Sequence, residues 1–330
     1  MISKFSGKTY KIFLFLLGFV ILIFSWLWFV DLFLENDDVY ASAPQNTQWV
    51  EVGKNKIAYQ YFPADTGKNV ALIGGTTAWS GVWKNTIEDL RGEYNIYAID
   101  LPPFGFSIVD EEYKYNLANQ ADLINGFLKK LNIQDVIFVA HSYGAGPSME
   151  AVLRNQDNYK KFIIIDGAIH VDRESKQPIG FVKSFFSIPT FRYLISSIAL
   201  HLPGFMEASL KYLVYDNSKV DDFWVGIYNQ PLSIENQSQK IAKWFYDFGF
   251  ENGTGLSSEG INYKDLAIPV VIIWGKEDAF TPLEQGLYLQ KIIPKNNLII
   301  LDKVGHIPMI DDHEGFIKVL KQNLEWNGNT

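Results

Sequence analysis

The chain of 330 residues contains no cysteine and fewer basic than acidic residues, 29 against 37. Without cysteine the protein must fold without disulfide bonds, although this absence leaves the redox compartment open. When the three lysines of the first eleven residues are set aside, 26 basic and 37 acidic residues give the remainder a net charge of −11. This balance argues against nucleic acid or an anionic lipid surface as the main partner.

Charged residues are also absent from one long stretch near the N-terminus. Residues 12–30 form an apolar run of 19 residues. At about 1.5 Å per residue, this run nearly matches the roughly 30 Å hydrocarbon core of a bilayer. We therefore expect a tail over 1–11, a transmembrane helix over 12–30 and a polar, acidic linker over 31–48.

A cleaved signal peptide is the alternative interpretation of this run. Its apolar core is normally about 7–15 residues long and is closely followed by a small-x-small cleavage site. The tripeptide at 41–43, Ala-Ser-Ala, fits that pattern but lies well beyond Val30 and precedes Pro44. The sequence therefore favours an uncleaved anchor.

The charges on either side of the apolar run predict its orientation. Three lysines precede it, whereas acidic residues follow it and no lysine or arginine appears again before Lys54. By the positive-inside rule, the tail is cytoplasmic and the domain from residue 49 onward lies outside the cell membrane. Trp26 and Trp28, near the outer end, suit the membrane–water interface.

The clearest chemical motif is the pentapeptide at 140–144, Ala-His-Ser-Tyr-Gly, which follows the apolar run 136–139 and precedes a helix-compatible stretch. A serine between small residues at a strand-to-helix turn is pushed out above the sheet. Small neighbours are needed because the turn is strained and larger side chains would collide with the adjoining strand and helix. Ser142 is the candidate nucleophile, although an ordinary strand-turn-helix fits this motif taken alone.

Two later loops supply partners in the order acid, then base. Asp278 follows the apolar strand 270–275, and His306 follows the short apolar strand 297–301. Asp166, at the end of the strand 162–165, is an alternative acid, but the Gly-x-x-Asp loop with a following proline favours Asp278. The remaining histidines are assigned no catalytic role, and no metal site is expected: His141, His170, His201 and His313.

With these residues in this order, the chain resembles the α/β-hydrolase superfamily from about residue 49 to 326. Residues 70–77 resemble the strand and loop that supply an oxyanion-hole amide, with Gly74 in place of the usual histidine. Residues 99–107 resemble the Asp-x-Pro-Gly-x-Gly-x-Ser stretch, with Pro103 in place of a glycine. The resemblance implies an α/β fold with a mostly parallel sheet flanked by helices, and oxyanion donors in the backbone amides of Thr76 and Tyr143.

The strand–helix alternation is interrupted between the sixth and seventh expected strands, where the resemblance implies a helical cap over the active site. This insertion, at about 168–262 within a domain of 49–330, is rich in aromatic residues. Most of them should form the core between the cap and the main domain, and a few should line an apolar pocket.

The chemistry implied is that of a serine hydrolase acting on a small acyl compound without a metal or organic cofactor. Ser142 attacks, His306 transfers the proton and Asp278 orients the imidazole. Each oxyanion amide contributes about 3 kcal/mol in comparable sites. An ester is the expected substrate, and a peptidase, thioesterase or perhydrolase uses the same triad. A silent ligand-binding module is the alternative of another class.

Overall fold

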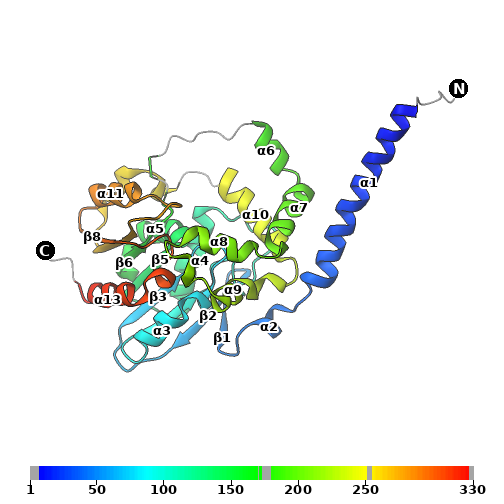
Figure 1. Cartoon of the computed structure of the whole chain (residues 1–330). Coiled ribbons are helices and arrows are strands. Elements are labelled where there is room, and N and C mark those ends of the chain that lie inside the picture. The colour runs from blue at the N-terminus through cyan, green and yellow to red at the C-terminus, as the bar shows by residue number, and fades with distance from the viewer. Residues whose placement is uncertain (1–6, 170, 173–179, 251–254, 327–330) are drawn as a thin grey trace.

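The main domain is built on one eight-stranded sheet in the order β1-β2-β4-β3-β5-β6-β7-β8. The computed structural model describes residues 7–169, 171–172, 180–250 and 255–326 (Figure 1). β1 and β2 form an antiparallel hairpin, β2 is antiparallel to β4, and the other neighbouring strands are parallel. The predicted mostly parallel α/β fold is confirmed. The strands are β1 (Thr47–Val52), β2 (Asn55–Phe62), β3 (Asn69–Ile73), β4 (Asn95–Ile99), β5 (Val136–His141), β6 (Tyr159–Ile165), β7 (Val270–Gly275) and β8 (Asn296–Leu301).

The central strands read as nearly continuous apolar runs because helices cover the sheet. All six residues of β5 and all six of β7 are buried. Helix α4 (Leu117–Lys130) packs against α5 (Ala145–Arg154), and α3 (Lys84–Leu90) packs against α13 (His313–Leu324). The remaining helices of the main domain are α11 (Leu283–Ile292) and the short α12 (Pro308–Asp311).

Among the described residues, five α-helices lie between β6 and β7, where the cap was expected. They are α6 (Gly180–Phe186), α7 (Pro189–His201), α8 (Phe205–Leu213), α9 (Asp222–Asn229) and α10 (Gln237–Phe250). Helices α7 and α10 pack side by side (Figure 1). Local sequence begins these helices: Pro189 is the first residue of α7, and the side chain of Asp221 caps α9 by accepting from the Trp224 amide.

The apolar N-terminal run forms helix α1 (Gly7–Phe29), which continues through a π-helical turn, η1 (Val30–Leu34). Figure 1 shows α1 projecting away from the rest of the molecule. Within the described part of the chain, Leu14–Leu34 is the one segment long and apolar enough to cross a membrane, by length and composition alone. A signal sequence shares these features.

The segment expected to be a linker is in large part fixed to the cap. Glu35 is 1% exposed, and its carboxylate lies 2.8 Å from His201 Nε2. The same carboxylate accepts hydrogen bonds from the amide and the hydroxyl of Ser238 on α10. Asp37 forms a short parallel bridge with Ile234. Glu35, an acidic residue of the expected linker, is therefore a buried acceptor that holds η1 against α7 and α10.

Replacing Glu35 with alanine should destabilise the protein, because the Ser238 amide and His201 would lose a buried acceptor. We expect the free energy of unfolding to fall by about 1–3 kcal/mol. Urea denaturation of the full chain in detergent measures this change. The matched control is Glu51→Ala, at an exposed position on β1. Equal effects of the two substitutions would contradict the assigned role of Glu35.

Candidate active site

Ser142 lies at the sharp turn between β5 and α5. Its φ is 51°, in the left-handed region, which costs a non-glycine residue roughly 1–3 kcal/mol. The turn also requires a glycine two residues later, since a Cβ on Gly144 would lie 2.4 Å from the carbonyl oxygen of Gly74. The strained turn expected from the small residues is present, and it holds the Ser142 hydroxyl at the end of a central strand.

The three candidate catalytic residues lie in one hydrogen-bonded chain. The Nε2 atom of His306 is 2.7 Å from the Ser142 hydroxyl, and its Nδ1 atom is 2.7 Å from Asp278 Oδ2. All three side chains are buried. Because Nδ1–H donates to the carboxylate, Nε2 is free to accept the serine proton. The structure thus brings together residues that are 136 and 28 positions apart in the sequence.

The loop after β7 prepares Asp278 as an ionised acceptor. Burial raises the pKa of this carboxyl, but hydrogen bonding to His306 and to Thr281 outweighs burial and holds the pKa below its ordinary value. Its Oδ1 atom accepts from the amides of Phe280 and Thr281 at 2.7 and 2.9 Å, and Oδ2 also accepts from the Thr281 hydroxyl at 2.6 Å. The carboxylate is therefore charged and fixed in orientation.

Asp166, the alternative acid, lies beside Asp278 and away from the histidine. Its Oδ1 atom accepts from the Gly275 amide at 2.7 Å, and its Oδ2 atom has no partner among the described residues. Burial, reinforced by the neighbouring charge of Asp278, raises the pKa of Asp166 well above its ordinary value. Of the two candidate acids, Asp278 lies within hydrogen-bond distance of His306, whereas the hydrogen bond of the Asp166 carboxyl goes to the Gly275 amide.

The two candidate oxyanion residues flank Ser142. A Cβ on Gly75 would lie 2.7 Å from the Cβ of Ser142, so the loop that carries Thr76 runs directly against the serine. The side chain of Tyr143 is buried elsewhere, edge-on to the ring of Trp244, with its hydroxyl accepting from Gln120 at 3.2 Å. Only the backbone of Tyr143 is thus left beside the serine.

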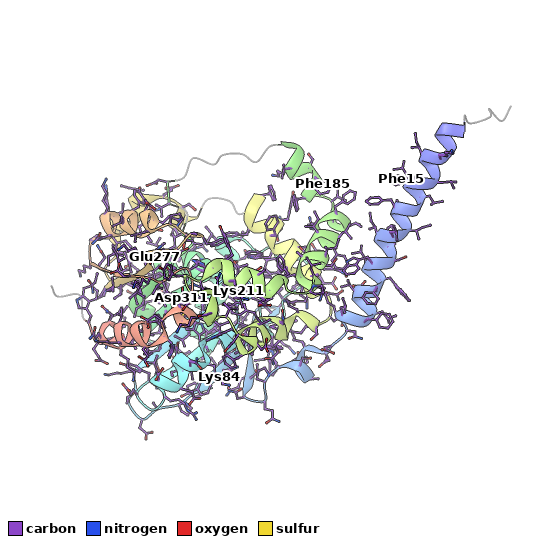
Figure 2. All side chains as sticks on the ribbon, in the orientation of Figure 1. Phe15, Lys84, Phe185, Lys211, Glu277 and Asp311 are labelled. Atoms are coloured by element: carbon purple, nitrogen blue, oxygen red, sulfur yellow. The ribbon has the colours of Figure 1, made fainter. Side chains whose placement is uncertain are left out.

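Two further residues, His141 and Asp311, hold the loop of His306 in place through hydrogen bonds. His141 Nε2 donates to the carbonyl oxygen of His306 at 2.7 Å, and burial lowers the pKa of His141 to about 3, so the ring is neutral. Asp311 (labelled in Figure 2) accepts from the amides of Gly305 and Tyr215 at 2.7 and 2.9 Å. The sequence around Asp311 carries no sign of this role, because nothing in it shows that the cap returns to this loop.

A cavity of about 530 Å³ opens over Ser142. On the side of the cap, the cavity is lined mainly by residues of α8 that recur at helical spacing. The sequence predicted an aromatic-rich insertion here but did not show which helix lines the cavity. None of the described lining residues is an aspartate, glutamate, lysine or arginine. The lining consists of Gly75, Thr76, Thr77, Ala78, His141, Ser142, Phe205, Met206, Ala208, Ser209, Leu210, Tyr212, Leu213, Tyr228, Phe280, His306 and Ile307.

No group of three or more histidine, aspartate or glutamate side chains among the described residues is arranged to hold a metal ion. What the site contains is a buried serine hydroxyl, a histidine able to accept its proton, and a charged carboxylate behind the histidine. This arrangement is suited to nucleophilic attack on a carbonyl carbon.

The chain is similar to several hydrolases. The uncharacterised hydrolase YugF of Bacillus subtilis is 27% identical over 252 residues, covering 76% of this chain and 88% of that protein. A 2-hydroxy-6-oxo-2,4-heptadienoate hydrolase of Pseudomonas putida is 23% identical and covers 78% of this chain and 89% of its own.

Solved structures share the fold at lower identity. The crystal structure of a membrane phospholipase A aligns with a TM-score of 0.69 at 19% identity, covering 94% of this chain and 97% of that one. The meta-cleavage product hydrolase CumD of Pseudomonas fluorescens aligns with a TM-score of 0.66 at 20% identity, covering 86% and 97%. The sequence profile described as the alpha/beta hydrolase fold matches residues 68–313, and the chain belongs to this family.

Proposed function

We propose that this protein is a membrane-anchored serine hydrolase that cleaves an ester or related acyl bond of an uncharged, apolar substrate. The observation that carries the proposal is the hydrogen-bonded chain from Asp278 through His306 to Ser142, set at the base of an apolar cavity.

The proposed reaction proceeds through an acyl-enzyme. His306 Nε2 takes the proton from the Ser142 hydroxyl as its oxygen attacks the carbonyl carbon, and then returns that proton to the leaving alcohol. Asp278 stabilises the imidazolium formed in between. The amides of Thr76 and Tyr143 donate to the oxyanion of the tetrahedral intermediate. A water molecule, deprotonated by His306, then releases the acid.

The cavity lining supports an apolar acyl group over an anionic substrate. The Pseudomonas putida relative is named for a dienoate, which carries a carboxylate. In the present cavity no described lysine or arginine faces the serine. A carboxylate placed there would lose its hydration without gaining a charged partner, at a cost of several kcal/mol. Carbon–carbon bond hydrolysis is the second candidate function. The similarity to hydrolases of dienoates and meta-cleavage products favours it, and the absence of a described cationic residue from the cavity lining disfavours it.

The anchor proposal rests on α1 and on the charges around it. The helix presents apolar side chains to its surroundings along most of its length: Leu16, Val20 and Phe24 are 54%, 45% and 60% exposed. Such a surface is stable in lipid and unstable in water. With lysines before the apolar run and acidic residues after it, the catalytic domain lies outside the cytoplasm.

A fluorophosphonate probe should label the full chain at Ser142. Ser142→Ala and His306→Ala should abolish labelling, and Asp278→Asn should slow it by about 10⁴-fold, since the histidine would lose its correct tautomer. The matched control is Asp166→Asn, which removes the neighbouring carboxyl and should leave the labelling rate within a few-fold of wild type. Slow labelling in Asp166→Asn but not in Asp278→Asn would assign the acid to Asp166. A folded wild type that stays unlabelled would indicate a binding module.

Substrate charge should determine turnover. We expect kcat/KM for p-nitrophenyl octanoate to exceed that for the mono-p-nitrophenyl ester of suberic acid by at least about 100-fold, because the second ester carries a carboxylate into the same cavity. Steady-state kinetics on this length-matched pair measures the ratio. Equal values, or cleavage of a 2-hydroxy-6-oxodienoate faster than of either ester, would favour the second candidate function. Amide and thioester substrates, and hydrogen peroxide as an acyl acceptor in place of water, are tested beside them to separate the remaining acyl-transfer activities.

The full chain should remain in the membrane pellet after alkaline carbonate extraction, with an intact N-terminus by mass spectrometry. The double variant Leu16→Asp/Val20→Asp should lose this retention, since each charge near the helix centre costs roughly 2.5–3.5 kcal/mol on insertion. The control is the double variant Lys219→Asp/Lys264→Asp, at exposed positions on the domain, which should be retained like the wild type. A soluble protein that begins after Ala43 would instead show that the segment is a cleaved signal.

A further inference from the structure

The cap is attached to the part of α1 that lies within the proposed membrane span. Ile23 and Leu27 of α1 pack against Tyr193 of α7 in one buried cluster. The indole N–H of Trp26 donates to the Ser197 hydroxyl at 3.0 Å. Ile23 lies seven residues before the outer end of the apolar run, a rise of roughly 10 Å along the helix. Given the proposed anchoring, on which this inference rests, α7 therefore lies at the boundary between headgroups and acyl chains.

An uncovered apolar stripe on α7 agrees with that depth. Ile188, Ile195, Ile198 and Leu202 recur at helical spacing and are 40–56% exposed. Figure 1 shows α7 beside α1. A helix with this stripe is stable at a membrane interface, where its apolar side chains are covered by lipid.

A cavity of about 680 Å³ lies between α1, α7, α10 and the loop at 109–115. Its membrane-side wall includes Phe24 and Leu27 of α1. Its opposite walls carry the polar side chains of α7 and α10, among them Arg192, Lys240 and Lys243. The cavity is thus apolar toward the bilayer and basic toward the protein.

Two of these cations have donors to spare. Lys240 Nζ donates to the carbonyl oxygen of Glu235 at 2.8 Å. The Arg192 guanidinium lies over the ring of Tyr246, 4.9 Å from its centroid, and its Nη1 makes only long hydrogen bonds of 3.4 Å with two carbonyl oxygens of the α6–α7 turn. Neither forms an ion pair with a described carboxylate. Lys243 differs, because Asp247 lies 2.8 Å from its ammonium.

Two carboxylates also face the cavity, from the loop on the main domain. Asp110 pairs with Lys54 at 3.5 Å and accepts from the Glu112 amide at 3.1 Å. Glu111 is exposed to solvent, which screens its charge. Neither carboxylate offsets the two unpaired cations on α7 and α10.

We propose that this cavity binds the phosphodiester headgroup of one membrane phospholipid, held by Arg192 and Lys240, with its acyl chains along Phe24 and Leu27. A phosphodiester supplies a negative charge and acceptor oxygens for the guanidinium and the ammonium. The net negative charge of the domain as a whole repels an extended anionic surface, so the proposed ligand is a single headgroup in this cavity. The bound lipid joins the cap to the leaflet beside α1.

The test compares two ligands with the same acyl chains, of which one carries a phosphodiester headgroup. Native mass spectrometry of the full chain in detergent measures the binding of dihexanoylphosphatidylglycerol and of dihexanoylglycerol, which lacks the phosphoglycerol headgroup. We expect the phospholipid to bind at least about tenfold more tightly, since charge-assisted hydrogen bonds are the stronger kind. The double variant Arg192→Gln/Lys240→Gln should abolish this preference. The matched double variant Lys219→Gln/Lys264→Gln removes the same charge from exposed positions and should retain it.

Hydrolysis of p-nitrophenyl octanoate serves as the folding control and should be unchanged in both double variants, because neither touches the Ser142 cavity. Equal binding of the two ligands by wild type, or a preference that persists in Arg192→Gln/Lys240→Gln, would overturn the proposal. Inorganic phosphate binding as tightly as the phospholipid would overturn it as well, since the apolar wall would then contribute nothing. Because binding is measured in detergent without catalysis, failure here is distinguishable from failure of carbonate retention or of esterase activity.

Discussion

The position of His306 depends on hydrogen bonds from three separate parts of the chain, and the site exists only where these parts meet. Its amide donates to the carbonyl oxygen of Leu213 at the end of α8, at 2.7 Å. Its carbonyl accepts from the neutral ring of His141, next to Ser142. Its side chain joins Asp278 to Ser142. Backbone and side chain are thus fixed together, as proton transfer at a defined distance requires.

One consequence is that the cap is part of the site's framework as well as its cover. A Cβ on Gly305 would lie 2.6 Å from the Leu213 carbonyl oxygen, so the chain leaving α8 runs directly against the histidine loop. Asp311 joins the same two segments from the other side through their amides. Movement of α8 away from the main domain would therefore disturb the backbone of His306. Substrate entry is more compatible with local change at the exposed side chains of α8 than with removal of the whole cap.

The sheet could be predicted from the sequence, and the residues of the candidate triad could be proposed from it, because both follow local rules. Buried parallel strands are apolar runs bounded by turns, and the loops after them carry the reactive residues. Ser142, Asp278 and His306 could each be found from the few residues around them. The lining of the cavity by α8 could not be found in this way, because apolar residues at helical spacing give the same sequence pattern whether they face a core or a cavity. Glu35 was missed for a related reason: an acidic residue in a polar segment carries no local sign that His201 and Ser238 will enclose it.

These contacts give the cap two fixed ends. At one end Glu35 holds η1 to α7 and α10, and Trp26 and Tyr193 hold α1 to α7. At the other end Leu213 holds the cap to the loop of His306. The helices between them form a continuous packed path from the apolar N-terminal helix to the loop of His306. Since packed helices shift as units more readily than they deform, tilting of α1 relative to the domain would be resisted first at α7. Under the proposed anchoring, this attachment sets the orientation of the cavity toward the bilayer, which a flexible linker of the same length would leave free.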